Sequence, residues 1–228
     1  MRTAAILPVK HFSQAKQRLG QSVADSLRLQ LARAMVADVL LALEECDSIE
    51  RTIVVTRESS VAVAASEAGA IVIEDAAESG QSAAANLGVA RAVAEGFERV
   101  LCVPGDCPAL DPAELEALLE DGAPSAPTVV IIPDRHGSGT NGLLLSPPEA
   151  ISPSFGPDSC ERHLALALAA GADCRIERPQ SLLLDIDTGA DLAVLRERLE
   201  GPWVGAERTR AVLGAPEQSL PLTRATGS

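Results

Sequence analysis

Short apolar segments alternate with longer amphipathic ones along the first 120 residues, and this alternation constrains the fold more than any other feature of the chain. Residues 3–9, 51–56, 70–74 and 99–103 are apolar runs of strand length. Between them lie segments with apolar residues at helical spacing, the first over residues 25–46. Strands separated by helices pair in parallel and are covered on both faces. We therefore expect a three-layer α/β/α fold.

The pattern changes after residue 121. Residues 128–132 and 142–146 are two apolar segments joined by a polar, Gly-rich loop, which predicts an antiparallel pair of strands. The sheet is thus expected to be mixed but mostly parallel. Later elements are expected as a helix at 159–170, a strand at 182–185 and a helix at 188–199. Residues 1–200 form one predicted domain, and residues 201–228, with little periodicity and frequent Gly and Pro, a mobile tail.

Composition excludes several classes of protein. The net charge of -13 disfavours binding to a polyphosphate backbone, and the aromatic content of 2% disfavours a single-strand nucleic-acid binder. Five cysteines without CxxC spacing, and no N-terminal signal, predict a reducing cytoplasm. No apolar stretch approaches the roughly 18 residues of a membrane span. We expect a cytoplasmic protein that binds neither nucleic acid nor membrane.

A basic segment follows the first predicted strand. It contains Lys10 and Lys16, the only lysines of the chain, together with Arg18. The first 24 residues hold four Lys or Arg and no Asp or Glu, so this segment is cationic within an anionic protein. Such a cluster is typical of phosphate binding. The alternative is a solvated surface loop.

Carboxylates follow two other predicted strands, where ligands of open parallel sheets bind. Asp106 lies between two prolines and after a glycine, in a turn that would hold it rigidly. A fixed carboxylate beside a phosphate site suggests Mg²⁺. The alternative is a turn aspartate that bonds its own backbone. Strand alternation would place Asp185 and Asp187 on one face, which suits a metal shared with Asp106 if the strand ends converge. Asp187 could otherwise only cap the following helix.

Polar groups suited to anions occur in two later segments. Residues 134–142 combine three glycines with Ser138, Thr140 and Asn141, so backbone and side-chain donors could meet an anion, or the segment could be a plain hairpin. Ser159, after Phe155-Gly-Pro-Asp, lies at a predicted helix start that could receive an anion or be simply capped.

Several further polar residues lie near predicted helix starts. Gln81, Ser82 and Asn86 could touch a nucleotide sugar or base. Arg162 and His163 are interpreted as surface residues and are assigned no role.

Six segments, taken together and in order, support a family resemblance. They are Pro8-Val-Lys, Ala15-Lys-Gln-Arg-Leu, Pro104-Gly-Asp-Cys-Pro, Asp134-Arg-His-Gly-Ser-Gly-Thr-Asn, Phe155-Gly-Pro-Asp-Ser and Leu184-Asp-Ile-Asp-Thr. The chain resembles, over nearly all of residues 1–200, the 2-phospho-L-lactate and phosphoenolpyruvate guanylyltransferases of deazaflavin coenzyme F-420 biosynthesis. The resemblance implies a glycosyltransferase-A-like, Rossmann-like nucleotidyltransferase fold. It also implies GTP as donor and a small phosphorylated three-carbon acid as acceptor, with the product passed to a downstream transferase of the same pathway.

The resemblance also implies roles for residues. Asp106 with Asp185 and Asp187 would hold Mg²⁺, as two ions. Thr140, Gly156 and Ser159 would bind the acceptor, although Asp158 adds a negative charge to that segment.

The charges assign the remaining roles. Lys10, Lys16 and Arg18 would hold the β- and γ-phosphates of GTP, because two anionic substrates need cations between them. Two alternatives stay open: another nucleotidyltransferase, of the molybdenum-cofactor or sugar-phosphate type, and a non-catalytic GTP-binding domain.

Overall fold

The computed structural model describes residues 1–12, 19, 23–120, 125–201 and 203–215. Its centre is a seven-stranded sheet in the order β3-β2-β1-β4-β6-β5-β7. The strands are β1 (Thr3–Val9), β2 (Arg51–Thr56), β3 (Ile71–Glu74), β4 (Arg99–Cys102), β5 (Thr128–Pro133), β6 (Thr140–Ser146) and β7 (Asp173–Ile176). Only β6 runs antiparallel to its neighbours, β4 and β5. The predicted mostly parallel, mixed sheet is confirmed.

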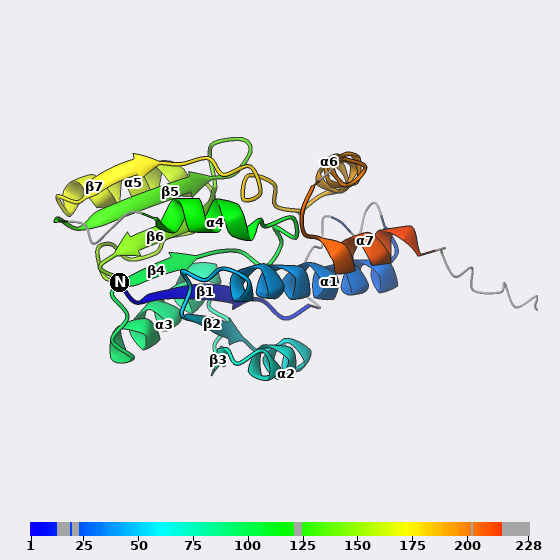
Figure 1. Ribbon diagram of the computed structural model, residues 1–228, viewed down its shortest axis with the longest axis horizontal. Helices are drawn as coiled ribbons and strands as arrows, with labels where there is room; N and C mark the ends of the chain where they lie inside the picture. The colour runs from blue at the N-terminus through cyan, green and yellow to red at the C-terminus, as the bar shows by residue number, and fades with distance from the viewer. Residues whose placement is uncertain (13–18, 20–22, 121–124, 202, 216–228) are drawn as a thin grey trace, which may run out of the picture.

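Helices cover both faces of this sheet (Figure 1). They are α1 (Asp25–Glu44), α2 (Ser59–Glu67), α3 (Gln81–Ala94), α4 (Pro112–Leu119), α5 (Ser159–Ala169), α6 (Gly189–Leu199) and α7 (Glu207–Gly214). Successive β1 residues point to opposite faces, so Leu7 packs with α1, α2 and α4 while Ile6 packs with α3. The predicted three-layer α/β/α arrangement is therefore confirmed. None of the helices described is long and apolar enough to cross a membrane.

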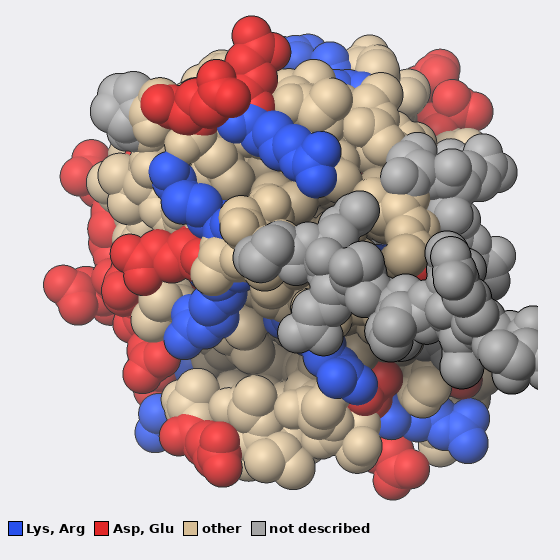
Figure 2. Space-filling model, turned by 90° about the vertical axis from the view of Figure 1, so that its right-hand side faces the viewer, with Lys and Arg blue, Asp and Glu red and all other residues tan. Residues whose placement is uncertain are grey.

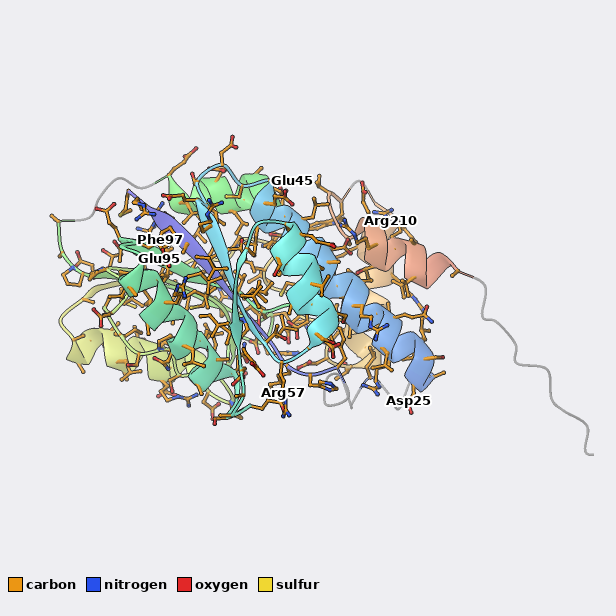
Figure 3. The ribbon with its side chains drawn as sticks, turned by 90° about the horizontal axis from the view of Figure 1, so that it is seen from below. Asp25, Glu45, Arg57, Glu95, Phe97 and Arg210 are labelled. Atoms are coloured by element: carbon orange, nitrogen blue, oxygen red, sulfur yellow. The ribbon has the colours of Figure 1, made fainter. Side chains whose placement is uncertain are left out.

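Helix α1 is buried on two sides, which explains its length and its many apolar residues. Ala32, Val36 and Val39, at helical spacing, pack against the sheet. Leu31 and Met35 face away from this stripe and pack in a third cluster with residues of α6 and α7. Burying one such large apolar side chain stabilises the fold by about 1.5–3 kcal/mol. Figure 3 shows α1 running from Asp25 toward Glu45, with α7, which carries Arg210, beside it.

The strand predicted at residues 182–185 is wrong. Residues 177–188 form no helix or strand, although Leu182, Leu184 and Ile186 are buried. Burial of alternate residues resembles the pattern of a strand, but this segment forms no strand ladder with a neighbour. The last strand is instead β7, which pairs in parallel with β5 at the sheet edge. Its four residues are exposed or half-buried, so no apolar run marks it in the sequence.

The segment after residue 200 also differs from the predicted mobile tail. Helix α7 packs on α1, and Ala206 is buried in the third cluster. The buried Asp38 of α1 accepts hydrogen bonds from the backbone N–H groups of Arg208, at 3.0 Å, and Thr209, at 2.8 Å. This cap comes from a distant helix, so local sequence could not indicate it. The division into a domain over residues 1–200 and a tail stays a prediction, and residues 216–228 lie outside the described part.

His163 on α5 is a buried polar residue, contrary to its interpretation as a surface residue. It is 0% exposed. Its Nδ1 lies 3.0 Å from Thr140 Oγ1 on β6, and its Nε2 accepts a hydrogen bond of 2.8 Å from the backbone N–H of Ser154. Burial, followed by the nearby charge of Arg162, lowers the pKa of this imidazole to about 4. His163 therefore ties α5 to the sheet in its neutral form.

We predict that His163 makes the protein less stable in mild acid. Between pH 6.5 and 5 the unfolded chain binds a proton on this ring and the folded chain does not, so the free energy of unfolding should fall by about 1.5 kcal/mol. Urea unfolding at both pH values would measure this fall. The control is His163→Gln, which keeps a polar side chain without a titrating ring. An equal fall in the two proteins would contradict the prediction.

Candidate active site

A pocket of about 500 Å³ opens at the edge of the sheet where β1 and β4 end and the antiparallel β6 begins. It is lined by residues from these strand ends and from α1, α3 and α5. Figure 2 looks onto this end of the molecule, where Lys and Arg side chains lie among Asp and Glu side chains. Ligands of open α/β sheets bind at this edge, so the pocket is the candidate active site.

Lys10 brings a positive charge to the pocket. It is exposed at the end of β1 and lines the cavity. The chain just after it is fixed by Phe12, whose side chain is buried. The Phe12 backbone N–H donates to Glu58 at 3.2 Å, and its carbonyl accepts from Arg28 at 3.2 Å. Lys16 and Arg18 lie outside the described residues, so their phosphate roles stay predictions.

Three carboxylates meet in the pocket. Asp106 follows β4, and Asp185 and Asp187 lie in the segment before α6. One oxygen from each lies within 4.8 Å of the others. The backbone N–H of Ile186 donates to the carbonyl of Asp106 at 3.0 Å, which joins the two segments directly. The convergence that a shared metal requires is therefore present, although no strand carries Asp185 and Asp187.

The electrostatics of this cluster favour a cation. Burial raises the pKa of the Asp185 carboxyl, and the negative charge of Asp106 raises it further. The side-chain amide of Asn141 opposes this shift by donating to Asp185 at 3.1 Å. An oxygen-only set of carboxylates suits a hard divalent cation. The cluster is thus fit to hold a divalent metal ion.

Thr188 and Asp191, which were assigned no role from sequence, fix the segment that carries Asp187. Thr188, not Asp187, is the N-cap of α6, and Asp191 completes a capping box with it. Asp191 Oδ2 also accepts from the backbone N–H of Asp187 at 3.1 Å. Its other oxygen pairs with Arg135 of the β5–β6 loop at 2.5 Å. The spacing of Thr188 and Asp191 was the sequence signal for this cap.

The residues predicted to bind the acceptor also line the pocket. They are Thr140 on β6, Gly156 before α5 and Ser159 at the start of α5. Ser159 Oγ is buried and has no hydrogen-bond partner among the described residues. Such a hydroxyl is suited to a ligand, because a buried polar group without a partner is costly. Asp158 is exposed and is not among the lining residues.

Backbone N–H groups at the start of α5 were expected to be free to bind an anion, but two of them already have partners. The N–H of Ser159 donates to the carbonyl of Gly156 at 3.2 Å, and that of Cys160 donates to Ser138 at 3.1 Å. Side-chain hydroxyls, rather than these two N–H groups, are thus the donors available here. Arg162, which was assigned no role, holds the preceding loop by donating to the carbonyls of Ser154, Phe155 and Pro157.

Of Gln81, Ser82 and Asn86, which were predicted to touch a nucleotide sugar or base, only Gln81 lines the pocket, together with Asp75 and Glu78. The Asn86 side chain instead donates to the carbonyls of Ser82, at 2.7 Å, and Pro153, at 3.2 Å. Ser82 Oγ lies 3.4 Å from the carbonyl of Phe155, to which it donates. These bonds tie α3 to the loop before α5, and nucleotide contact by Ser82 and Asn86 stays a prediction.

Comparison with known proteins identifies the family. Residues 3–198 match the family model described as guanylyl transferase, CofC like. The chain is 48% identical to the phosphoenolpyruvate guanylyltransferase of Conexibacter woesei, over 93% of this chain and 96% of that protein. It is 36% identical to the protein of the same name from Sphaerobacter thermophilus, over 86% of this chain and 93% of that one.

A solved structure shows the same fold. The putative nucleotide-diphospho-sugar transferase of Desulfovibrio desulfuricans G20 superposes with a TM-score of 0.72 at 18% identity, over 93% of this chain and 94% of that one. This similarity confirms the predicted fold, and the family model and the relatives confirm the predicted enzyme class, a nucleotidyltransferase. The chain belongs to the family of CofC-like guanylyl transferases.

Proposed function

We propose that this enzyme transfers GMP from GTP to the phosphate group of phosphoenolpyruvate. One observation carries the proposal: a single pocket combines a lysine, a three-carboxylate cluster and, on Ser159, a buried hydroxyl without a partner among the described residues. These are groups that two phosphorylated substrates need. Relatives that match nearly the whole chain are named for this reaction. Their names favour phosphoenolpyruvate over 2-phospho-L-lactate as the acceptor.

The reaction needs little covalent help from the protein. A phosphate oxygen of phosphoenolpyruvate attacks the α-phosphorus of GTP, and a new P–O bond forms. The bond between the α-phosphorus and the oxygen that bridges to the β-phosphate breaks, and pyrophosphate leaves with that electron pair. A phosphate oxygen is already ionised and nucleophilic at neutral pH, so no general base is required. Positioning and charge stabilisation are therefore the main tasks of the pocket.

We assign the two substrates to different residues of the pocket lining. Lys10, with Lys16 and Arg18 as predicted from sequence, would hold the β- and γ-phosphates and stabilise the leaving pyrophosphate. Gln81 lines the pocket at the start of α3, where we place the nucleoside. Thr140, Gly156 and Ser159 lie toward β6 and α5, where we place phosphoenolpyruvate.

The carboxylate cluster lies in the same pocket, in the segments after β4 and before α6. Asp106, Asp185 and Asp187 would hold Mg²⁺, as two ions, since they offer only oxygen ligands. Bound there, Mg²⁺ would neutralise charge on the α-phosphate and on the attacking phosphate.

Cellular context follows from the same chemistry. All five cysteines are free thiols, which suits a reducing cytoplasm. The phosphoanhydride product is an activated donor, so a downstream transferase of deazaflavin coenzyme F-420 biosynthesis would consume it.

Pyrophosphate release tests the proposal. We expect release from GTP with phosphoenolpyruvate and Mg²⁺, and little release when ATP or CTP replaces GTP. Parallel reactions with 2-phospho-L-lactate and 3-phosphoglycerate test the acceptor. Release from ATP at the same rate would contradict guanylyl transfer. Activity with 2-phospho-L-lactate alone would reject the proposed acceptor.

Asp106→Asn should lower the rate by about 10²-fold or more, because it removes a negative charge from the cluster. The thermal unfolding temperature should rise on addition of Mg²⁺ in the natural protein and change little in the variant. Asp111→Asn is the matched control, since Asp111 caps α4 outside the cluster and Asn caps equally well. Near-normal turnover of Asp106→Asn would contradict its role.

Lys10→Ala should raise the KM for GTP by roughly ten- to a hundredfold, as expected for loss of a hydrogen bond between charged groups. Steady-state kinetics with phosphoenolpyruvate at saturation would measure it. Arg51→Ala is the control, because Arg51 is exposed at the opposite end of the parallel strands, where β2 begins. An unchanged KM for GTP in Lys10→Ala would show that this lysine does not hold the nucleotide.

A further inference from the structure

His163 contacts two parts of the proposed acceptor site, Thr140 on β6 and the loop of Ser154 and Phe155 before α5. It follows Ser159 by one turn of α5 and has no exposed surface. The ring of Phe155 packs edge-on against the imidazole, with 5.3 Å between ring centroids and an angle of 76° between planes. His163 is not among the pocket-lining residues, so it would act on a ligand only through its neighbours.

The hydrogen bond from Ser154 determines which ring nitrogen carries the proton. A backbone N–H can only donate, and the N–H of Ser154 lies 2.8 Å from Nε2. Nε2 must therefore accept and carry no hydrogen. In a neutral imidazole the hydrogen is then on Nδ1. The low pKa of about 4 agrees with a neutral ring, because burial disfavours the imidazolium.

The protonated Nδ1 in turn orients the hydroxyl of Thr140. Nδ1 lies 3.0 Å from Thr140 Oγ1, so Nδ1–H donates and the hydroxyl oxygen accepts. The hydroxyl cannot also give its own hydrogen to His163. That hydrogen is left for another acceptor, and Thr140 lines the pocket. With the opposite tautomer, Thr140 would donate to the ring and present only lone pairs to a ligand.

We infer that His163 is a positioning residue that makes the Thr140 hydroxyl a hydrogen-bond donor to an anionic acceptor. This inference rests on the proposed function, which places phosphoenolpyruvate beside Thr140. A donating hydroxyl stabilises a phosphate or carboxylate oxygen, whereas lone pairs directed at it would repel it. The same ring accepts the hydrogen bond from Ser154. Gly156, in the same loop as Ser154, also lines the pocket.

Two substitutions separate the two hydrogen bonds of His163. The amide of Asn reaches roughly the position of Nδ1, so His163→Asn can still donate to Thr140 but loses the bond from Ser154. The amide of Gln reaches roughly the position of Nε2, so His163→Gln can accept from Ser154 but loses the donor to Thr140. A role in holding the loop alone would make the Gln variant the milder of the two.

We expect His163→Gln to raise the KM for phosphoenolpyruvate by about tenfold, as for loss of one hydrogen bond to a charged group, and to leave the KM for GTP unchanged. His163→Asn should raise it less. Thr140→Val should match His163→Gln, and combining the two should add little, because both act on the same hydrogen bond from the Thr140 hydroxyl to the acceptor. The inference is overturned if Gln is as mild as Asn or milder, or if the double variant shows the product of the single effects.

Nitrogen NMR of the histidine rings tests the tautomer without any turnover. The ring of His163, assigned by its absence from His163→Gln, should show hydrogen on Nδ1 and none on Nε2 at pH 7. Hydrogen on Nε2, or on both nitrogens, would overturn the inference. Failure of the natural enzyme to use phosphoenolpyruvate would instead reject the proposed function, and the NMR result would then decide the orientation of Thr140 alone.

Discussion

Mutual repulsion of negative charges is the constraint on which this structure depends. Three carboxylates lie with one oxygen each within 4.8 Å of the others, in a protein with a net charge of -13. Repulsion at such distances is weakened little in a partly buried site, so the backbone must hold the groups together. It does so through the hydrogen bond from the backbone N–H of Ile186 to the carbonyl of Asp106, and through the capping box of Thr188 and Asp191. Binding of a cation removes this repulsion, so it should stabilise the folded site strongly.

Thr140 and Asn141, consecutive residues of β6, link the carboxylate cluster to the proposed acceptor site. Thr140 contacts His163 of α5, while Asn141 donates to Asp185 and to the carbonyl of Leu182. Neighbouring residues of a strand point to opposite faces, so a single strand end orients a hydroxyl on one side and a carboxylate on the other. Asn141 is buried, and its side-chain amide donates both of these hydrogen bonds, so a small shift of β6 would disturb both substrates.

Much of the fold could be predicted from sequence, because the alternating apolar segments reflect burial on both faces of a sheet. The six strands other than β7 were predicted close to their observed bounds. What was missed has non-local causes. Strand β7 is an edge strand that is only half-buried, and α7 is capped by Asp38, 170 residues away from Arg208. His163 is covered by the loop that contains Ser154 and Phe155, and its position in a predicted helix did not indicate this burial.

The proposed reaction requires the acceptor phosphate to lie beside the carboxylate cluster. Manganese, a paramagnetic divalent ion with similar oxygen preference, can report this distance through phosphorus NMR of phosphoenolpyruvate. We predict strong, Mn²⁺-dependent broadening of the phosphoenolpyruvate signal in the natural protein, and its loss in Asp106→Asn. Binding of phosphoenolpyruvate without such broadening, while Mn²⁺ is bound, would place the acceptor elsewhere and contradict the account.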